Sequence, residues 1–426
     1  MTNQKSPFGK MTLRDLVIPI IKSIDSFNFL LKSHHRRTTI ISYHIGRELG
    51  LNDIDLFELV VSSGLHDIGA LSIQEQDLLI QEDVIKPLPH CIMGHRMLAS
   101  FDAFQNIAQI IRHHHIKYIE SLHFSEEEIP FQSHIINLAD RVDVLSNQSP
   151  HIMTNITNII DKITAATGTV FHPKVSKSFQ NIAGTDSFWL EIDSLEIDQI
   201  FHRIDASIDL NLSMDNIVEF SFILSKIIDF RSHFTATHSY TVAHLASLLG
   251  EYFNFSKEKC LKLRVAGYLH DIGKIGINPA LIEKPGPLTA EEFNLVKQHA
   301  HFTGQILKEL NASAWFSEIV TWTERHHEKS DGTGYPYSLD DSRLDVGTKI
   351  LAFADIISAL MEERPYRKKL SISSAFEIIR SKMAPSISLS MFQTIEQHKH
   401  QINKLVIKCQ VHTFEEYNIA RIIDSA

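Results

Sequence analysis

Histidines and aspartates recur along this chain in one ordered set, and the set occurs twice. The tetrapeptide His-Asp-Ile-Gly lies at residues 66–69 and again at 270–273, an offset of 204 positions. The other members keep that offset, as His34 and His238 do, or one that grows to 215 for Asp140 and Asp355. An offset that only grows is typical of a duplicated domain with small insertions in its second copy.

The set in the second copy has the residue types of a metal centre. One buried histidine, such as His299, is most often a core residue with a satisfied hydrogen bond. Seven candidates in register favour ligation, and they are too many for one metal that also keeps an open position. They are His238, His270, Asp271, His299, His326, His327 and Asp355.

Such a set suits two adjacent divalent metals, with Asp271 bridging them because a carboxylate has two oxygens. Imidazole and carboxylate donors suit Fe, Mn or Zn, and the donor types do not choose among the three. Two neighbouring metals can stabilise both the attacking and the leaving oxygen of a phosphoryl displacement. The chemistry expected from these residues is therefore hydrolysis of a phosphate ester.

Sulfur donors are not expected in this centre. The chain has three cysteines, Cys91, Cys260 and Cys409, and no CxxC pair. That number and spacing exclude a disulfide framework and a thiolate zinc site. We therefore expect any metal to be held by nitrogen and oxygen.

Composition limits the class of protein. A length of 426 residues with 43% apolar content predicts two or three soluble domains. The net charge of −10 argues against stable DNA or RNA binding. Without a cleavable leader or a long apolar run, the sequence predicts a cytoplasmic protein that is not bound to a membrane.

The elements that must position these residues are predicted to be helices. Thr289 and Glu292 form a capping box, and an apolar face with helical spacing follows, on which His299 lies. That face consists of Phe293, Val296, Ala300, Thr303 and Leu307. Residues 260–273 predict a second helix that ends at His270. Alternating strand patterns are scarce, so we expect an all-α fold, with the seam between the copies in the polar stretch 203–216.

The second half, about residues 225–375, resembles an HD-GYP domain of the HD phosphohydrolase superfamily. The resemblance rests on THSYTVAHLASLLG, LHDIGKIGI, KPGPLTAEE, HHEKSDGTGYP, FADIISAL and RPYR, in that order. It implies a helical bundle that hydrolyses a cyclic dinucleotide with metals held by the seven residues above. It also implies catalytic roles for Asp271 and Lys274.

Further residues of the second half are implied to contact the substrate. The resemblance assigns this role to Lys274, to Tyr335 of the Gly-Tyr-Pro turn, and to Arg364 and Arg367 of RPYR. Phe234 stands where some members have a carboxylate that supports a third metal, so two metals are expected.

The first half, about residues 30–200, resembles the same domain more faintly. It keeps residues at every ligand position: His34, His66, Asp67, His90, His114, His115 and Asp140. Ala70 replaces the lysine, and neither the Gly-Tyr-Pro turn nor RPYR is present. Ligands without substrate contacts predict a regulatory or scaffold domain that still binds metal.

The expected organisation is two tandem HD-type helical bundles, a degenerate one in residues 1–205 and a catalytic one in residues 215–426. The leading hypothesis is a metal-dependent phosphodiesterase of a cyclic dinucleotide, either cyclic di-GMP or cyclic GMP-AMP. The alternatives are a general nucleotide phosphohydrolase acting on phosphomonoesters and a non-catalytic cyclic dinucleotide receptor. The sequence leaves open whether one or two bonds are cut, which signalling proteins are partners, and the oligomeric state.

Overall fold

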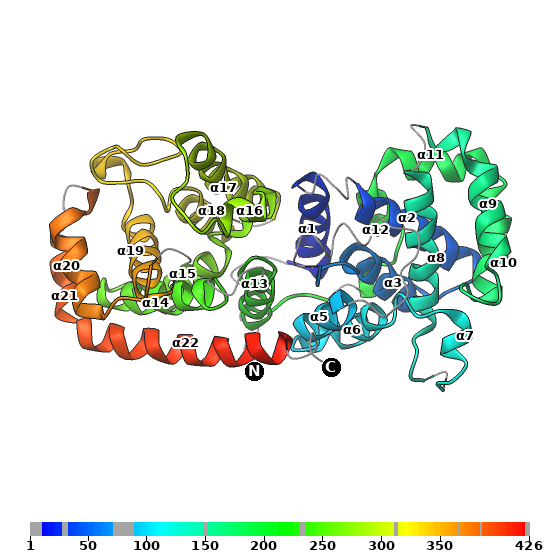
Figure 1. The fold of residues 1–426 in the computed structure, drawn as a ribbon, viewed down its shortest axis with the longest axis horizontal. Helices are drawn as coiled ribbons and strands as arrows, with labels where there is room; N and C mark the ends of the chain where they lie inside the picture. Colours follow the sequence, from blue (N-terminus) through cyan, green and yellow to red (C-terminus); the bar gives the residue numbers. More distant parts are fainter. Residues whose placement is uncertain are drawn as a thin grey trace. The chain divides into compact units, whose positions relative to one another are not determined.

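The regular secondary structure is entirely helical in the part of the chain that the structure describes. The computed structural model describes residues 11–27, 33–70, 89–125, 127–147, 151–208, 210–230, 235–310, 314–363, 367–383 and 386–421. Within these ranges, apart from three isolated bridges, no β-strand occurs. The expected all-α fold is confirmed (Figure 1).

The chain divides into two units. One comprises Thr12–Asn211, and the other comprises Met11 and the residues from Leu212 onward. The division between Asn211 and Leu212 lies inside the polar stretch 203–216. It leaves one set of candidate ligands in each unit.

The first unit is built around α2 (His34–Glu48), which packs on α3 (Asp53–Leu65) and on α8 (Phe131–Ser146). The side chain of Asn52 caps α3 by accepting a hydrogen bond from Asp55 N. The remaining α-helices are α1 (Leu13–Phe27), α5 (Pro89–Leu98), α6 (Gln105–Arg112), α7 (Tyr118–Ser121), α9 (Ile156–Ala165), α10 (Pro173–Ala183), α11 (Asp186–Ser194) and α12 (Ile197–His202).

The second unit repeats this plan around α14 (His238–Tyr252), which packs on α15 (Lys257–Leu269) and on α19 (Val346–Met361). The other helices are α13 (Met214–Asp229), η4 (Ile272–Gly276), α16 (Pro279–Ile282), α17 (Ala290–Glu309), α18 (Phe316–Glu324), η5 (Asp341–Arg343), α20 (Ile372–Lys382), α21 (Leu389–Gln397) and α22 (Lys399–Arg421). The long α22 packs along α14 (Figure 1). Among the described helices, none has the length and apolar character needed to cross a membrane.

Helix α17 begins as the sequence predicts, but its apolar face is only partly buried. Thr289 and Glu292 form the expected capping box. Ala300, Thr303 and Leu307 are buried, whereas Phe293 is 45% exposed. The expectation for Phe293 was wrong because the first turns of α17 lie at the surface, where its ring packs edge-on against the ring of Tyr335, 6.1 Å between centroids.

The glycine of each His-Asp-Ile-Gly motif permits a close helix contact. A Cβ atom at Gly273 would lie 2.1 Å from the carbonyl oxygen of His299 on α17. A Cβ atom at Gly69 would lie 2.2 Å from the carbonyl oxygen of His90 on α5. Only glycine allows this approach. The motif thus brings the helix that carries a candidate ligand against the His-Asp pair.

Candidate metal centre

The seven candidate ligands of the second half come together from five segments of the bundle. His238 is the first residue of α14, and His270 caps the C-terminus of α15 with Asp271 directly after it. His299 lies in α17, His326 and His327 follow α18, and Asp355 lies in α19. Most of the set lies at helix ends. Where a helix ends, the chain turns, so the side chains of consecutive residues can point toward the same site.

Asp271 lies at the middle of this centre. Its Oδ2 is 3.3 Å from His270 Nε2 and 3.9 Å from His238 Nε2, whereas its Oδ1 is 3.4 Å from His299 Nε2. Around it, two groups of donors are each close enough to hold an ion. They are His238 with His270 and Asp355, and His299 with His326 and His327. One carboxylate thus faces both groups, as a bridging ligand must.

Backbone carbonyls fix the orientation of the imidazoles. The Nδ1 atoms of His270, His299 and His326 donate to the carbonyl oxygens three residues earlier, at 2.8, 2.6 and 2.7 Å. A carbonyl only accepts, so Nδ1 carries the hydrogen and Nε2 is left to face the centre.

Several atoms that face the centre lack an ordinary partner. Within the described residues, His270 Nε2, His326 Nε2 and Asp271 Oδ1 are buried and make no hydrogen bond. His299 Nε2 and His327 Nε2 point at each other across 3.2 Å. Buried polar atoms are normally satisfied, and cations between these atoms would satisfy them. The residues present therefore fit divalent metals.

The charge states also suit metal binding. Burial alone would raise the pKa of Asp271, but His270 and Lys274 hold it well below its usual range. Burial lowers the pKa of His299 to about 4 and that of His326 to about 3. At neutral pH the carboxylate is ionised and both imidazoles are neutral, which are the forms that bind metals.

Lys274 lies at the edge of the centre. It follows the motif glycine on η4, and its Nζ is 2.5 Å from Asp271 Oδ2. Its side chain is partly exposed, in contrast to the buried ligands. The Lys274 ammonium group is thus held against the Asp271 carboxylate while remaining accessible from outside.

Glu328, directly after the histidine pair, binds the backbone of the segment that follows the Gly-Tyr-Pro turn. Its buried carboxylate accepts hydrogen bonds from the backbone N–H groups of Tyr337 at 2.6 Å and Leu339 at 2.8 Å. A Cβ atom at Gly334 would lie 2.4 Å from Glu328 Cα, so glycine is needed there. Sequence reasoning gave Glu328 no role, although its place inside HHExxDGxGYP was a signal.

Tyr335 lies against a candidate ligand. Its backbone N–H donates to the carbonyl of His327 at 3.2 Å, and the two ring centroids are 4.8 Å apart. The Tyr335–Pro336 peptide bond is cis. The turn thus places an aromatic side chain beside the metal centre.

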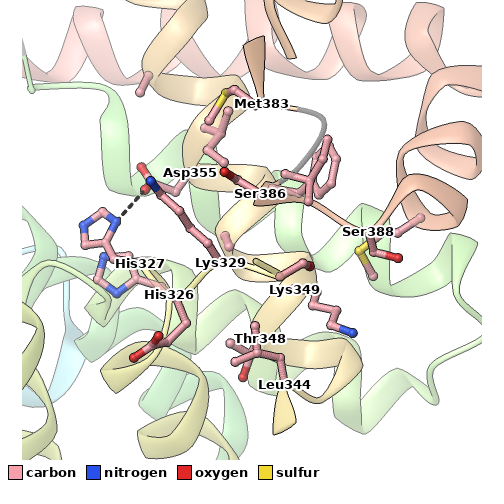
Figure 2. A pocket seen from close by; sticks show the side chains of 18 of the residues that line it. His326, His327, Lys329, Leu344, Thr348, Lys349, Asp355, Met383, Ser386 and Ser388 are labelled. Atoms are coloured by element: carbon pink, nitrogen blue, oxygen red, sulfur yellow. Dashed lines mark ion pairs between the residues drawn. The ribbon is translucent and has the colours of Figure 1, made fainter. Parts of the chain in front are cut away.

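A cavity of about 460 Å³ adjoins the centre (Figure 2). His326, His327 and Asp355 form one part of its wall, and Met383, Ser386 and Met391 are among the residues of another. Lys329 and Lys349 also line this cavity (Figure 2).

Arg367 also lines this cavity, and its Nη2 donates to the carbonyl of Ala359 at 2.6 Å. The expectations for Arg364 and Phe234 fall outside the described residues.

The first half brings its own set together in the same way. His34 begins α2, His66 caps α3 with Asp67 after it, and His90 lies in α5. His114 and His115 follow α6, and Asp140 lies in α8. His34 Nε2 is 3.0 Å from His66 Nε2, and Asp67 Oδ1 is 3.2 Å from His90 Nε2.

The remaining members of the first set are also close. His115 Nδ1 is 3.9 Å from Asp140 Oδ2, and His114 Nε2 is 3.7 Å from Asp67 Oδ1. The other six candidate residues of the first half therefore lie together around Asp67. Ala70 stands where the second half has Lys274, and it is buried.

Cys91 lies among the first-half histidines, although the sequence predicts a centre of nitrogen and oxygen donors only. Its Sγ is 3.5 Å from His90 Nε2, and it groups with His90, His114 and His115 as a set that could hold an ion. Burial alone would raise the pKa of the thiol, but His114 and His90 lower it to about 6. The absence of a CxxC pair excluded an all-thiolate site and not a mixed one.

Comparison with known proteins agrees with this arrangement. A family model described as HD domain matches residues 17–172 and 223–386. The 3'3'-cGAMP-specific phosphodiesterase 1 of Vibrio cholerae is 25% identical to this chain, over 93% of this chain and 94% of that protein's length. The cyclic di-GMP phosphodiesterase of Thermotoga maritima is 34% identical over 39% of this chain and 45% of its own length.

A second curated relative and a solved structure extend the comparison. The 3'3'-cGAMP-specific phosphodiesterase 3 of Vibrio cholerae is 32% identical over an alignment that covers 64% of this chain and 57% of that protein's length. A crystal structure of a cyclic GMP-AMP specific phosphodiesterase from V. cholerae superposes with a TM-score of 0.63, covering 91% of this chain and 98% of that one at 24% identity. It shows that the two share a fold. With its family model matched in both halves, the chain belongs to the HD domain family, as the motifs of its second half predict.

Proposed function

We propose that the second half is a metal-dependent phosphodiesterase that opens a cyclic dinucleotide, with cyclic di-GMP and 3'3'-cyclic GMP-AMP as the candidate substrates. The observation that carries the proposal is the Asp271 centre, which joins two groups of ligands, contacts Lys274, and borders a cavity. Curated relatives named as phosphodiesterases of these two messengers support it.

The ligands would hold two divalent metals, Fe or Mn before Zn, with Asp271 between them. When bound, such a pair supplies Lewis-acid stabilisation of the oxygens in a phosphoryl displacement. The chain's own contribution is to fix the donors: three backbone carbonyls orient His270, His299 and His326 before any ion arrives. Preformed donors lose little freedom on binding.

Lys274 is proposed to steady the negative charge of the phosphate during the reaction. Its ammonium group lies 2.5 Å from Asp271 Oδ2 and is partly exposed, so it can also reach a substrate oxygen. A fixed cation that interacts most strongly when charge develops acts mainly on the rate. Asp271 and Lys274 are therefore the proposed catalytic pair.

The cavity beside His327 and Asp355 is proposed to hold part of the dinucleotide. Its volume of about 460 Å³ lies in the range of small-molecule sites. Lys329 and Arg367 on its wall supply positive charge that suits a phosphodiester, and Tyr335 supplies a ring beside the metals. Arg364 is proposed to act with Arg367, because both belong to RPYR.

The first half is proposed to bind metal without opening cyclic dinucleotides. Its Asp67 contacts histidine rings, as Asp271 does, but Ala70 provides no cation beside it. Positioning supplies much of the rate of phosphoryl transfer, and this half lacks the turn and the arginines that would position a cyclic diester. Its role would be to modulate the second half or to act on a smaller phosphate ester. A cytoplasmic location and signalling partners, both expected from the sequence, belong to the same proposal.

The test is an assay of the purified full-length protein with cyclic di-GMP, 3'3'-cyclic GMP-AMP and a linear dinucleotide that carries a terminal phosphate. Appearance of linear dinucleotide from either cyclic substrate, dependent on divalent metal, is expected. Turnover of the terminal phosphate alone would favour a general phosphohydrolase. Binding of a cyclic dinucleotide without any turnover would favour a receptor.

A further inference from the structure

Cys91 occupies a position in the first centre that has no donor in the second. It follows His90 on α5, and its side chain is 1% exposed. In the second half Ala300 follows His299 and is completely buried. The two centres thus share their histidine and aspartate sets, but only the first has a sulfur atom at this buried position.

The atoms around Cys91 converge on one point. The donors of His90, Cys91, His114 and His115 all lie within 4.8 Å of one another. His90 Nε2 is 3.3 Å from His114 Nε2 and 3.5 Å from Cys91 Sγ. The Nδ1 of His114 donates to the carbonyl of Ile111 at 2.6 Å, so its Nε2 is the atom left to face His90.

Two further buried atoms at this point, one oxygen and one nitrogen, also face the donors. Within the described residues, Asp67 Oδ1 and His115 Nε2 make no hydrogen bond. The Asp67 side chain is 3% exposed, and its Oδ1 lies 3.2 Å from His90 Nε2. A carboxylate oxygen and a ring nitrogen buried in this way need a cation or a proton donor.

The donor spacing matches one four-coordinate metal ion. Two imidazole nitrogens bound tetrahedrally, each about 2.05 Å from a metal, are about 3.3 Å apart. A thiolate at about 2.3 Å and an imidazole nitrogen on the same metal are about 3.5 Å apart. The nitrogen pair at 3.3 Å and the sulfur–nitrogen pair at 3.5 Å agree with both values.

We propose that the thiolate of Cys91 is a metal ligand, which makes the first half a mixed nitrogen, oxygen and sulfur centre. His90, His114 and Cys91 supply three donors, and Asp67 Oδ1 or His115 completes the set. Thiolate is a soft ligand, so this site takes a tetrahedral Zn²⁺ or a similar ion, whereas the candidate ligands of the second half are nitrogen and oxygen donors only. This proposal about the metal ligands of the first half does not depend on which substrate the protein hydrolyses.

The test uses the full-length protein, stripped of metal with a chelator and reloaded with Co²⁺. A thiolate bound to Co²⁺ gives a sulfur-to-cobalt charge-transfer band in the near ultraviolet, which imidazole and carboxylate ligands do not give. We expect the wild-type protein to show this band and Cys91→Ser to lose it. Cys260→Ser and Cys409→Ser are matched controls, because both thiols are buried and neither is grouped with candidate ligands; they should keep the band.

Two more measurements keep the proposal falsifiable. In Asp271→Ala, which removes the bridging residue of the second half, the band should persist. In a Zn²⁺ titration, Cys91→Ala should weaken one class of site at least tenfold and leave the other unchanged. The absence of a charge-transfer band from the wild-type protein, or its survival in Cys91→Ser, would show that Cys91 forms only a thiolate–imidazolium pair or a core contact.

Discussion

Glu362 holds His238 in place by accepting a hydrogen bond from His238 Nδ1 to its Oε2, at 3.0 Å. It lies directly after α19, which carries Asp355. In the first half, Asp143 Oδ2 is 2.6 Å from His34 Nδ1. The position that matches Asp143 in the second half is Ser358, which lies 3.3 Å from His238 Nδ1 and donates to Glu362 at 3.0 Å. Both halves therefore orient the first histidine with a carboxylate, from positions that do not correspond.

Replacing Glu362 should weaken metal binding by the second half. A carboxylate behind a ligating histidine fixes its tautomer and raises its basicity, and removing such a partner costs about 10–100-fold in metal affinity. We expect Glu362→Ala to show this loss and Glu362→Gln a smaller one, because an amide oxygen still accepts. Metal titration measures it. Glu363→Gln, at an exposed neighbouring residue, is the control, and equal affinities for all variants would contradict the orienting role.

Replacing the central aspartate of either half should separate the two centres. Asp271→Ala should lose second-half metal and diesterase turnover while the helical circular dichroism stays largely intact. Asp67→Ala should lose first-half metal and keep diesterase turnover. Metal analysis and the diesterase assay of both variants test these expectations. Near-normal turnover by Asp271→Ala would remove the assigned active site, and loss of turnover in Asp67→Ala would show that the first half is needed for it.

Lys274→Ala should keep its metal and lose rate. The ammonium group acts on charge that develops during the reaction, and loss of one such group lowers kcat by about 10²–10³-fold. Removing a cation from Asp271 leaves the carboxylate free to bind metal. Metal analysis combined with kcat and KM tests this, and Lys284→Ala, whose lysine pairs with Glu292, is a suitable control. A change in KM alone would assign Lys274 to substrate binding only.

Gly273→Ala should destabilise the second half and disturb its metal site. The added Cβ would lie 2.1 Å from the carbonyl oxygen of His299, so α17 must move. Overpacking of this kind costs about 1–3 kcal/mol. Gly286→Ala is the matched control, because a Cβ there meets nothing within 4 Å. Thermal unfolding with and without metal measures the difference, and equal stability of the two variants would rule out the close contact.

Arg367→Ala, alone and together with Arg364→Ala, should weaken cyclic dinucleotide binding without removing metal. Arg367 lines the cavity beside Asp355, and a guanidinium can grip two phosphate oxygens at once. Lys369→Ala tests whether general surface charge matters, since Lys369 is exposed. Calorimetry with the catalytically impaired Lys274→Ala protein as background measures binding directly. An unchanged affinity would leave the arginines a structural role only, such as the bond from Arg367 to Ala359.

The sequence could predict the helical fold and the residue types of both centres, because repeats and periodic patterns are local properties. The offset between the copies picked out residues that the structure brings together around Asp67 and Asp271. Their roles as ligands stay a prediction. Phe293 was misplaced because periodicity says which face is apolar and not how far along the helix that face is covered.

Contacts between distant positions could not be predicted in the same way. Glu362 and His238 are 124 positions apart, and only the packing of α19 on α14 brings them together. Asp143 was within reach of sequence reasoning, because it lies three residues after Asp140 on the same helical face. Cys91 stands directly after His90 in the sequence, but the number and spacing of cysteines do not predict which histidines lie near each thiol.

The two hydrogen bonds from Tyr337 and Leu339, just after the Gly-Tyr-Pro turn, to Glu328 have a thermodynamic consequence. Glu328 directly follows His326 and His327, so one short segment carries two candidate metal ligands and the residue that accepts these hydrogen bonds. We therefore expect metal binding and an ordered conformation of the turn to stabilise each other, because such linkage is reciprocal. If the ion raises the equilibrium constant for ordering Tyr335 by some factor, then ordering Tyr335 raises the affinity for the ion by the same factor. A ligand that orders Tyr335 would therefore also strengthen metal binding. We therefore expect metal and substrate to bind cooperatively to the segment that carries HHExxDGxGYP.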